Sequence, residues 1–500
     1  MDRLASAQID KKAFSAGSLL APSDEKAYWL SKTPQERLQA LELMRQIVYG
    51  YDPSTTRLQR VFEVAQRSGG SRQMTADAKR IYRAFDPAPL CGDQNDLYVP
   101  LDDVRGSSSL VPRLTKPIRF SDKATFQLLA GHIGSGKSTE LRRVQRDLEI
   151  GEDRFFTVFC QVLEDIDPSD ADFPDVLLAI LRQVAAEFRE RLQIELKPGY
   201  LRQRLEEVKK LLGSEVTLES LSIDSALGNF TAAIKSSPST RDQIRGALTA
   251  TTERWIDAAN DVLGEALTQA QKKGYAGLAI IVDDLDKLSM LHEPELRGSV
   301  AERLYMERHV QLTSFRCHMI YTIPIALAYS CKEREIASRY AMTAPPVVPM
   351  TKVVDIEGKR CEPGFERFRT VIARRLKDAG ATEKDVFAGD AVRDRIIECS
   401  GGQPRFLVTM MRDAIVEGDL PLTEAVVNTV ARKATHSYSR QLQKEHWRII
   451  EEVRKTHALE RTEKNASLCM DLLASGAVLQ YLNEKEWYAP NPLLPKRSKK

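Results

Sequence analysis

Residues 131–138 read Gly-His-Ile-Gly-Ser-Gly-Lys-Ser and combine flexible glycines with a lysine and a hydroxyl. This G-x4-G-K-[ST] spacing, after an apolar stretch at 126–130 and before a helical pattern, suits the binding of a polyphosphate with a divalent cation. The glycines allow backbone N–H groups to surround phosphate oxygens, and the following helix N-terminus adds a positive dipole. Lys137 would place its charge between the β- and γ-phosphates, and Ser138 would offer its hydroxyl to Mg²⁺. The residues expected to bind the ligand are Gly131, Gly134, Ser135, Gly136, Lys137, Ser138 and Thr139.

His132 also lies in this loop. A histidine at such a position more often projects outward than takes part in chemistry, so the sequence gives it no role.

Three aspartates follow a second apolar stretch, GLAIIV at residues 277–282. Such a run is typical of a strand buried on both faces, and it ends at the carboxyl edge, where ligands of open α/β sheets bind. Asp283 would accept a hydrogen bond from a water bound to the metal, so Asp283 and Ser138 are the predicted metal residues. Asp284 lies where many ATPases carry a glutamate that orients the attacking water, and Asp286 is the other nearby acid. Taken alone, the run could equally be the capped start of a helix.

Two further polar residues follow elements of the same kind. Thr322 lies near the end of the apolar strand CHMIYTIP, from which its hydroxyl could reach the γ-phosphate or the attacking water. Arg405 follows Ser-Gly-Gly-Gln-Pro in the first turn of a helix, from which a lid could carry it into the phosphate pocket. The alternatives are a simple strand-end hydroxyl and a solvated arginine. The letters SGGQ also mark transporter-type ATPases, but there they precede the aspartate-bearing strand, whereas here they come long after Asp283.

The elements that must position these residues alternate between strand-like and helix-like patterns from Ala76 onward. Such alternation predicts βα units and a mostly parallel sheet, so the expected fold class is α/β. Long charged helices are expected between two strands of this sheet and are interpreted as an insertion. The predicted parts are an N-terminal helical module at 1–70, a core at 76–355 with a helical insertion at about 170–275, a helical lid at 356–420, and a long helix with a winged-helix-like domain and basic tail at 421–500.

Composition excludes several classes of protein. The formal net charge of +3 argues against a protein that mainly coats nucleic acid or an anionic membrane. No apolar run approaches the roughly 20 residues of a membrane helix, and the first residues lack the apolar region of a secretory signal. The seven cysteines form no CxxC pair, which is typical of reduced thiols. We therefore expect a cytoplasmic protein that does not bind membranes.

The ordered set GHIGSGKSTEL, IIVDDLDKL, IYTIP, VVPM and SGGQPR resembles the AAA+-like P-loop ATPases, particularly the origin-recognition-like and STAND-type branches of bacterial conflict and antiphage systems. The resemblance covers about residues 76–490. It implies a P-loop NTPase sheet, ATP and Mg²⁺ as cofactors, a homo-oligomer, and control of a separately encoded effector protein, as in antiviral defence. It also implies an arginine finger that completes a neighbour's site, which matches Arg339, with Arg334 as the fallback. The Asp-Asp pair at 283–284 departs from the family's Asp-Glu, which leaves the rate of hydrolysis open.

Residues 440–490 resemble a winged-helix domain, with helices at 445–456 and 466–474 and a hairpin whose turn lies near Asn483. Related ATPases hold DNA with such a domain, which requires lysine and arginine on the helix that enters the groove. Residues 465–481 contain neither and include Asp471. Packing against the ATPase or a partner is therefore favoured. The alternative functions are a DNA-binding origin-recognition- or transposition-type ATPase, and a nucleotide-binding scaffold without turnover.

Overall fold

The computed structural model describes residues 32–33, 76–90, 94–106, 109–211, 222–290, 298–462 and 464–496. The chain divides into two units, Met1–Gln73 and Met74–Lys500. The N-terminal helical module predicted at 1–70 lies outside the described residues, apart from residues 32–33. The fold described below is that of the second unit.

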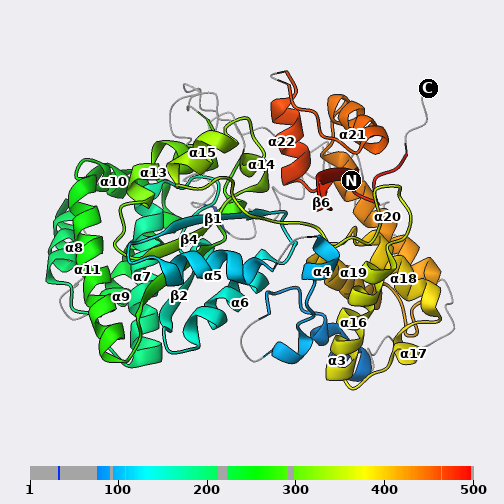
Figure 1. Ribbon diagram of the computed structural model, residues 1–500, viewed down its shortest axis with the longest axis horizontal. Helices are drawn as coiled ribbons and strands as arrows, with labels where there is room; N and C mark the ends of the chain where they lie inside the picture. The colour runs from blue at the N-terminus through cyan, green and yellow to red at the C-terminus, as the bar shows by residue number, and fades with distance from the viewer. Residues whose placement is uncertain are drawn as a thin grey trace. The chain divides into compact units, whose positions relative to one another are not determined.

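A five-stranded parallel sheet forms the centre of this unit (Figure 1). Its strands are β1 (Phe126–Gly131), β2 (Phe155–Gln161), β3 (Gly277–Asp283), β4 (His318–Thr322) and β5 (Val347–Val348). The strand order is β2-β3-β4-β1-β5, and β4 therefore separates β3 from β1. The register pairs Leu129 with Thr322 and Gln161 with Asp283, so the strand ends that carry Gly131, Asp283 and Thr322 lie at one edge. A parallel sheet of this kind, with a glycine-rich loop and a helix after β1, fits a P-loop fold.

The two faces of the sheet bury different side chains, because successive strand residues point to opposite faces. Leu128 and Ile280 belong to a large core that includes side chains of helices α7 (Phe173–Leu192) and α11 (Thr252–Lys272). Leu129 and Ile281 belong to a smaller core with helices α5 (Leu110–Phe120) and α6 (Lys137–Glu149). The unit is thus a three-layer α/β structure, in agreement with the predicted fold class.

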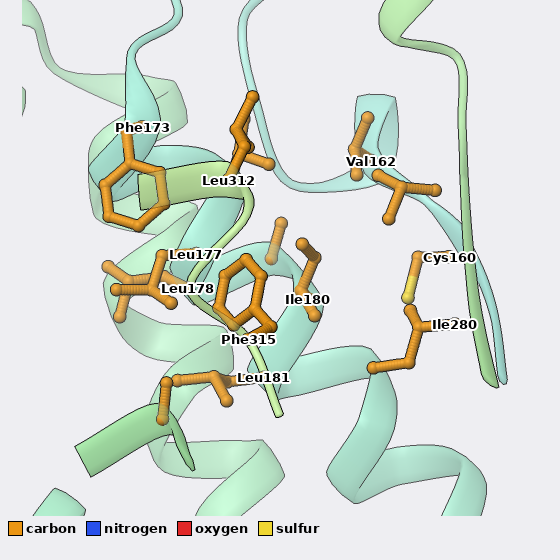
Figure 2. Close-up of a cluster of buried hydrophobic side chains, with 14 of the residues drawn as sticks. Cys160, Val162, Phe173, Leu177, Leu178, Ile180, Leu181, Ile280, Leu312 and Phe315 are labelled. Carbon is orange, nitrogen blue, oxygen red and sulfur yellow. The ribbon is translucent and has the colours of Figure 1, made fainter. Parts of the chain in front are cut away.

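Five helices lie between β2 and β3 in the described part of the segment predicted to be an insertion. They are α7, α8 (Gly199–Leu211), α9 (Ile223–Ser236), α10 (Pro238–Thr249) and α11. Helix α7 begins with a capping box between Asp172 and Asp175 and with a proline in its first turn, features that favour a helix start. Figure 2 shows side chains of α7, including Leu177 and Leu181, beside Phe315 in the large core. These helices therefore share their core with the sheet.

A second group of helices surrounds a separate apolar core, which contains Phe85, Phe368, Ile396 and Met411. Its helices are α3 (Ala76–Ala84), α16 (Glu362–Asp378), α17 (Glu383–Val386), α18 (Asp390–Cys399), α19 (Pro404–Glu417) and α20 (Glu424–Arg440). Most of these helices lie in the segment predicted to form the lid. Figure 1 shows them together, with α3 beside α16.

The long helix predicted at the start of the 421–500 segment, over about residues 422–457, is wrong as one continuous helix, whereas the helix predicted at 445–456 is confirmed. The chain forms α20 and then a separate helix, α21 (Lys444–Thr456). Gln443 has an extended backbone, which interrupts the helix between α20 and α21. The side chains of Gln443 and His446 cap the start of α21 reciprocally. Helix α22 (Ala466–Ala474) and the hairpin of β6 (Val478–Leu482) and β7 (Glu486–Pro490) follow, with the turn where the sequence predicts it.

The C-terminal elements pack against the sheet-bearing core. Trp447, Ile450 and Leu472 share an apolar cluster with Ile325 and Tyr329, which lie after β4. The short elements of the unit are α4 (Asp102–Arg105), α12 (Val300–Glu302), α13 (His309–Leu312), α14 (Ile325–Ala328), α15 (Glu333–Arg339) and the helical turns η2 (Asn95–Leu97), η3 (Val162–Glu164), η4 (Leu285–Lys287) and η5 (Arg303–Glu307).

No helix in the described ranges combines the length and the apolar character needed to cross a membrane.

Candidate functional site

The loop between β1 and α6 depends on left-handed glycines. Gly134 and Gly136 have φ angles of 84° and 99°. A Cβ atom on Gly134 would lie 3.2 Å from the Cβ of Arg405, and one on Gly136 would lie 3.1 Å from Nη2 of Arg105. Both the backbone angle and the close packing therefore favour glycine at these positions. The loop is held between α4 on one side and the start of α19 on the other.

The Lys137 ammonium lies inside this loop with three oxygen partners. Its Nζ is 2.7 Å from the carbonyl oxygen of Gly131, 3.0 Å from that of His132 and 2.8 Å from Oδ2 of Asp286. Lys137 and Asp286 are both buried. Because an ammonium has three N–H donors, these three acceptors use all of them. A phosphate oxygen would therefore have to replace at least one of these acceptors.

The predicted metal residues fit a hard cation. Ligand oxygens of Asp283, Asp284 and Asp286 all lie within 4.8 Å of one another. Oδ1 of Asp283 is buried without a hydrogen-bond partner among the described residues. Burial and the neighbouring Asp286 raise the pKa of Asp283 to about 6, although a hydrogen bond with Ser138 opposes the shift. A hydroxyl beside a carboxylate with a spare oxygen is the oxygen-only donor set that Mg²⁺ prefers.

Asp284 and Asp286 have different partners in the structure. Asp284 has a left-handed backbone with φ of 72°, and its carboxylate lies 2.5 Å from Nζ of Lys287. Asp286 contacts Lys137, and its backbone N–H donates to Oγ1 of Thr322 at 3.3 Å. A pocket lies beside the glycine-rich loop. Asp286 is among the described residues that line this pocket, and Asp284 is not. The acid that pairs with Lys137 is therefore Asp286, although the sequence placed Asp284 first as the acid that orients the water.

This pocket has both polar and apolar lining residues. Gly134, Gly136, Lys137, Ser138 and Thr139 of the loop line it. Charged side chains such as Arg375 line it as well, and so do apolar residues from the chain before α5 and from the lid helices, namely Pro87, Pro89, Leu90, Leu97, Val99, Val371 and Val408. Phosphates at the loop and a base against the apolar wall would match these two chemistries. These apolar residues could not be predicted from the sequence, because they are dispersed over turns and helices and belong to no motif.

Thr322 and Arg405 approach the loop from different elements. Thr322 is fully buried at the end of β4, where its hydroxyl accepts from Asp286 and lies 3.4 Å from the carbonyl oxygen of Val282. It therefore acts on Asp286 and not directly on the pocket. Arg405 lines the pocket, and its backbone N–H donates to the carbonyl oxygen of Gly134 at 3.3 Å.

Arg339 is not brought to this pocket. It ends α15, and its guanidinium donates to the carbonyl oxygen of Met306 and to Glu335, and lies 2.8 Å from Nδ1 of His309. Arg334 is exposed on the same helix. Neither arginine is among the described residues that line this chain's own pocket. Any role for them in hydrolysis would require a neighbouring subunit.

Two buried arginines near the site escaped prediction. Arg105 donates to Glu140 at 3.0 Å and to the carbonyl oxygen of Ser135 at 2.5 Å, so it supports the loop. Arg375 of α16 lines the pocket and donates to the carbonyl oxygen of Ala84 at 2.7 Å; burial lowers its pKa. Neither arginine lies in a recognisable motif. Their positions at the site become visible only in the structure, where segments far apart in the sequence lie in contact.

Arg105→Ala is expected to destabilise the second unit by about 3 kcal/mol, because it leaves the buried Glu140 with one cation fewer and the Ser135 carbonyl without this donor. Urea unfolding measures the change. Arg143→Ala is the matched control: Arg143 also pairs with Glu140, at 2.6 Å, but its side chain is 28% exposed, so water can partly replace it and the loss of stability should be smaller. Equal losses in the two variants would contradict a supporting role for Arg105.

His132 does not project outward as the sequence suggested. Its side chain is 1% exposed, and both imidazole nitrogens contact backbone groups of the C-terminal elements. Burial and the nearby Lys137 lower the pKa of His132 to about 3, so the ring is neutral.

No family model matches the sequence, and no curated protein matches it. Among solved structures, the chain is similar to a Walker-type ATPase of Pyrococcus abyssi, with 12% identical residues, a TM-score of 0.43, and coverage of 82% of this chain and 98% of that chain. At so distant a similarity, the P-loop fold rests on the strand order and the glycine-rich loop described above.

Proposed function

We propose that this chain is an ATP-binding and ATP-hydrolysing regulatory ATPase that uses Mg²⁺. One observation carries the proposal: Lys137, Ser138, Asp283 and Asp286 meet at one sheet edge, beside a pocket lined by the glycine-rich loop and by apolar side chains. The choice of ATP over GTP rests on the family resemblance of the motifs.

In this proposal, the residues of the site have separate roles. Backbone N–H groups of the loop and the Lys137 ammonium hold the β- and γ-phosphates. Ser138 and Asp283 hold Mg²⁺, which when bound neutralises phosphate charge. Asp286 accepts a hydrogen bond from the attacking water, and Thr322 fixes Asp286 through its backbone N–H. Arg405 approaches the phosphates from the first turn of α19.

We further propose that the protein forms a homo-oligomer and controls an effector protein in antiviral defence. Arg339 supports the first part, because it lies outside its own pocket, where a finger for a neighbouring subunit must lie. The DNA-binding alternative is less well supported. The helix that would enter the groove, α22, packs against α14 and has no lysine or arginine.

Arg339→Ala is expected to lower ATP turnover at saturating protein concentration by roughly 10³-fold, the usual contribution of an arginine finger, and to leave ATP affinity unchanged. Phosphate release and equilibrium binding measure the two quantities, and Arg334→Ala is the matched control from the same helix.

Mixing provides a sharper test of Arg339. An oligomer of Arg339→Ala and Lys137→Ala subunits would contain sites with an intact loop completed by an intact Arg339. Mixing these two inactive variants should therefore restore part of the turnover. Failure of the mixture to recover activity, when both variants still associate with wild-type subunits, would remove Arg339 as a finger.

The proposed function itself is tested by nucleotide binding and phosphate release of the wild-type chain, with Lys137→Ala as the inactive control. Binding without any release of phosphate above that control would favour the nucleotide-binding scaffold instead. Salt-dependent binding to duplex DNA would favour the origin-recognition-type alternative.

A further inference from the structure

The side chain of His132 connects the phosphate-binding loop to the C-terminal elements. Its Nδ1 is 3.1 Å from the carbonyl oxygen of Leu473 in α22, and its Nε2 accepts from the backbone N–H of Gln480 in β6 at 3.0 Å. A carbonyl can only accept a hydrogen bond and a backbone N–H can only donate one. The two partners therefore fix one tautomer, a neutral imidazole with its proton on Nδ1.

The backbone of the same residue holds the phosphate-binding lysine. The carbonyl oxygen of His132 accepts from Nζ of Lys137 at 3.0 Å and from the N–H of Ser135 at 3.1 Å. His132 thus contacts the loop's lysine through its main chain and the C-terminal elements through its side chain. A displacement of β6 relative to the loop would act on the contacts of Lys137 through a single residue.

Strand β6 also contacts the other parts of the site. The hydroxyl of Tyr481 donates to the carbonyl oxygen of Gly401 at 2.8 Å, in the turn that precedes the Arg405 helix. The carbonyl oxygen of Gln480 accepts from the N–H of Met350 at 3.1 Å, just after β5. Gln480 and Tyr481 are each 1% exposed. The hairpin is therefore a structural part of the nucleotide site and not a peripheral appendage.

We propose that His132 is a positioning residue through which docking of the β6–β7 hairpin sets the conformation of the phosphate-binding loop, so that nucleotide affinity and hairpin docking are linked. The inference rests on the proposed function. The carbonyl of His132 accepts from Lys137 and from the N–H of Ser135, so the docked side chain of His132 holds the loop in the conformation that would receive a phosphate. Because linkage is reciprocal, a partner that displaces the hairpin would weaken nucleotide binding, and a bound nucleotide would hold the hairpin in place.

Four substitutions of His132 separate hydrogen bonding from packing. His132→Phe keeps the ring volume and removes both hydrogen bonds, whereas His132→Ala removes volume as well. His132→Asn keeps a donor near the position of Nδ1, and His132→Gln keeps an acceptor near that of Nε2. The alanine and phenylalanine variants should bind a non-hydrolysable ATP analogue with Mg²⁺ about 10-fold more weakly, a typical size for coupling between sites. The asparagine and glutamine variants should fall between these and the wild type.

Steady-state kinetics should show KM raised by a similar factor while kcat changes less than about twofold, because Asp283 and Asp286 are untouched. Two spectroscopic results are also expected. Imidazole ¹⁵N shifts should report a proton on Nδ1 of His132 in the folded protein. Hydrogen exchange of the Gln480 amide should slow when the nucleotide analogue saturates the wild type, and this response should be lost in His132→Phe.

Wild-type affinity in His132→Phe, or a Gln480 amide that does not respond to the nucleotide, would overturn the inference. If the His132 variants do not fold, Tyr481→Phe tests the inference instead, because it removes a hydrogen bond of β6 at a position outside the pocket. Weaker nucleotide binding in this variant supports the linkage, and unchanged binding overturns it. Failure of the proposed function gives a different result, since the wild-type chain would then bind the analogue no better than Lys137→Ala.

Discussion

Replacement of Lys137 by alanine is expected to abolish nucleotide binding, with an affinity at least about 100-fold lower, since hydrogen bonds to charged groups contribute about 1.5–3 kcal/mol each. Lys137 is the only residue of the 131–138 loop that carries a full positive charge, and it lines the pocket. Titration of a fluorescent ATP analogue with Mg²⁺ measures the loss. Unchanged affinity would show that the pocket is not the nucleotide site.

The same substitution also has a structural cost that must be separated from the loss of a ligand contact. Lys137 and Asp286 form a buried ion pair at 2.8 Å, and removal of one partner from such a pair costs about 3–5 kcal/mol. The double variant Lys137→Ala with Asp286→Ala removes both charges. It should recover much of the free energy of unfolding and still fail to bind nucleotide. Recovery of binding together with stability would mean that Lys137 acts only on the fold.

Asp286→Asn is expected to lower the rate of ATP hydrolysis by roughly 10²–10⁴-fold, the usual contribution of a positioned general base, with little change in ATP affinity. The substituted side chain keeps its size and an oxygen that can accept from Lys137, and the backbone N–H to Thr322 remains. The neutral side chain also leaves the Lys137 charge without its ion-pair partner, so the free energy of unfolding should fall, whereas the loss of rate reports the charge that would orient the water. Single-turnover phosphate release measures the chemical step directly.

Asp284→Asn is the matched control, because the two acids lie in the same turn and differ in their partners. Asp284 is paired with Lys287 and lies outside the described lining of the pocket, so its neutralisation should change the rate less than about 10-fold. If Asp284→Asn instead removed activity and Asp286→Asn did not, the order suggested by the sequence alone would be right.

Sequence predicted the central elements well because their determinants are local. The apolar runs before Gly131 and Asp283 form β1 and β3 within a residue or two of the expected bounds, and the glycine-rich turn follows from spacing alone. The single helix predicted near 422–457 failed for a local reason as well. The capping pair of Gln443 and His446 starts a new helix, which the winged-helix resemblance places at 445–456, but its residue types are unusual for a cap and gave no signal for the break before it.

The rest of the site could not be predicted because it depends on contacts between distant segments. His132 is fixed by Leu473 and Gln480, more than three hundred residues away, and nothing near it in sequence distinguishes a buried histidine from an exposed one. Arg105 is likewise defined by Glu140 and the Ser135 carbonyl. The choice between Asp284 and Asp286 required the contact of Asp286 with Lys137 and its place in the pocket, since the sequence places both acids at plausible positions.

The position of β4 between β1 and β3 sets the width of the proposed catalytic centre. The lysine-bearing loop follows β1 and the aspartates follow β3, so the two groups are separated by one intervening strand. Neighbouring strands lie about 4.8 Å apart, which spaces β1 and β3 by about 9.6 Å. Backbone hydrogen bonds of the sheet impose this separation, whatever side chains β4 carries. The separation of the two strand ends is therefore insensitive to most substitutions in β4. Thr322, which accepts from the backbone of Asp286, is the exception, and sequence drift elsewhere in β4 should alter the stability of the protein before it alters the alignment of the reacting groups.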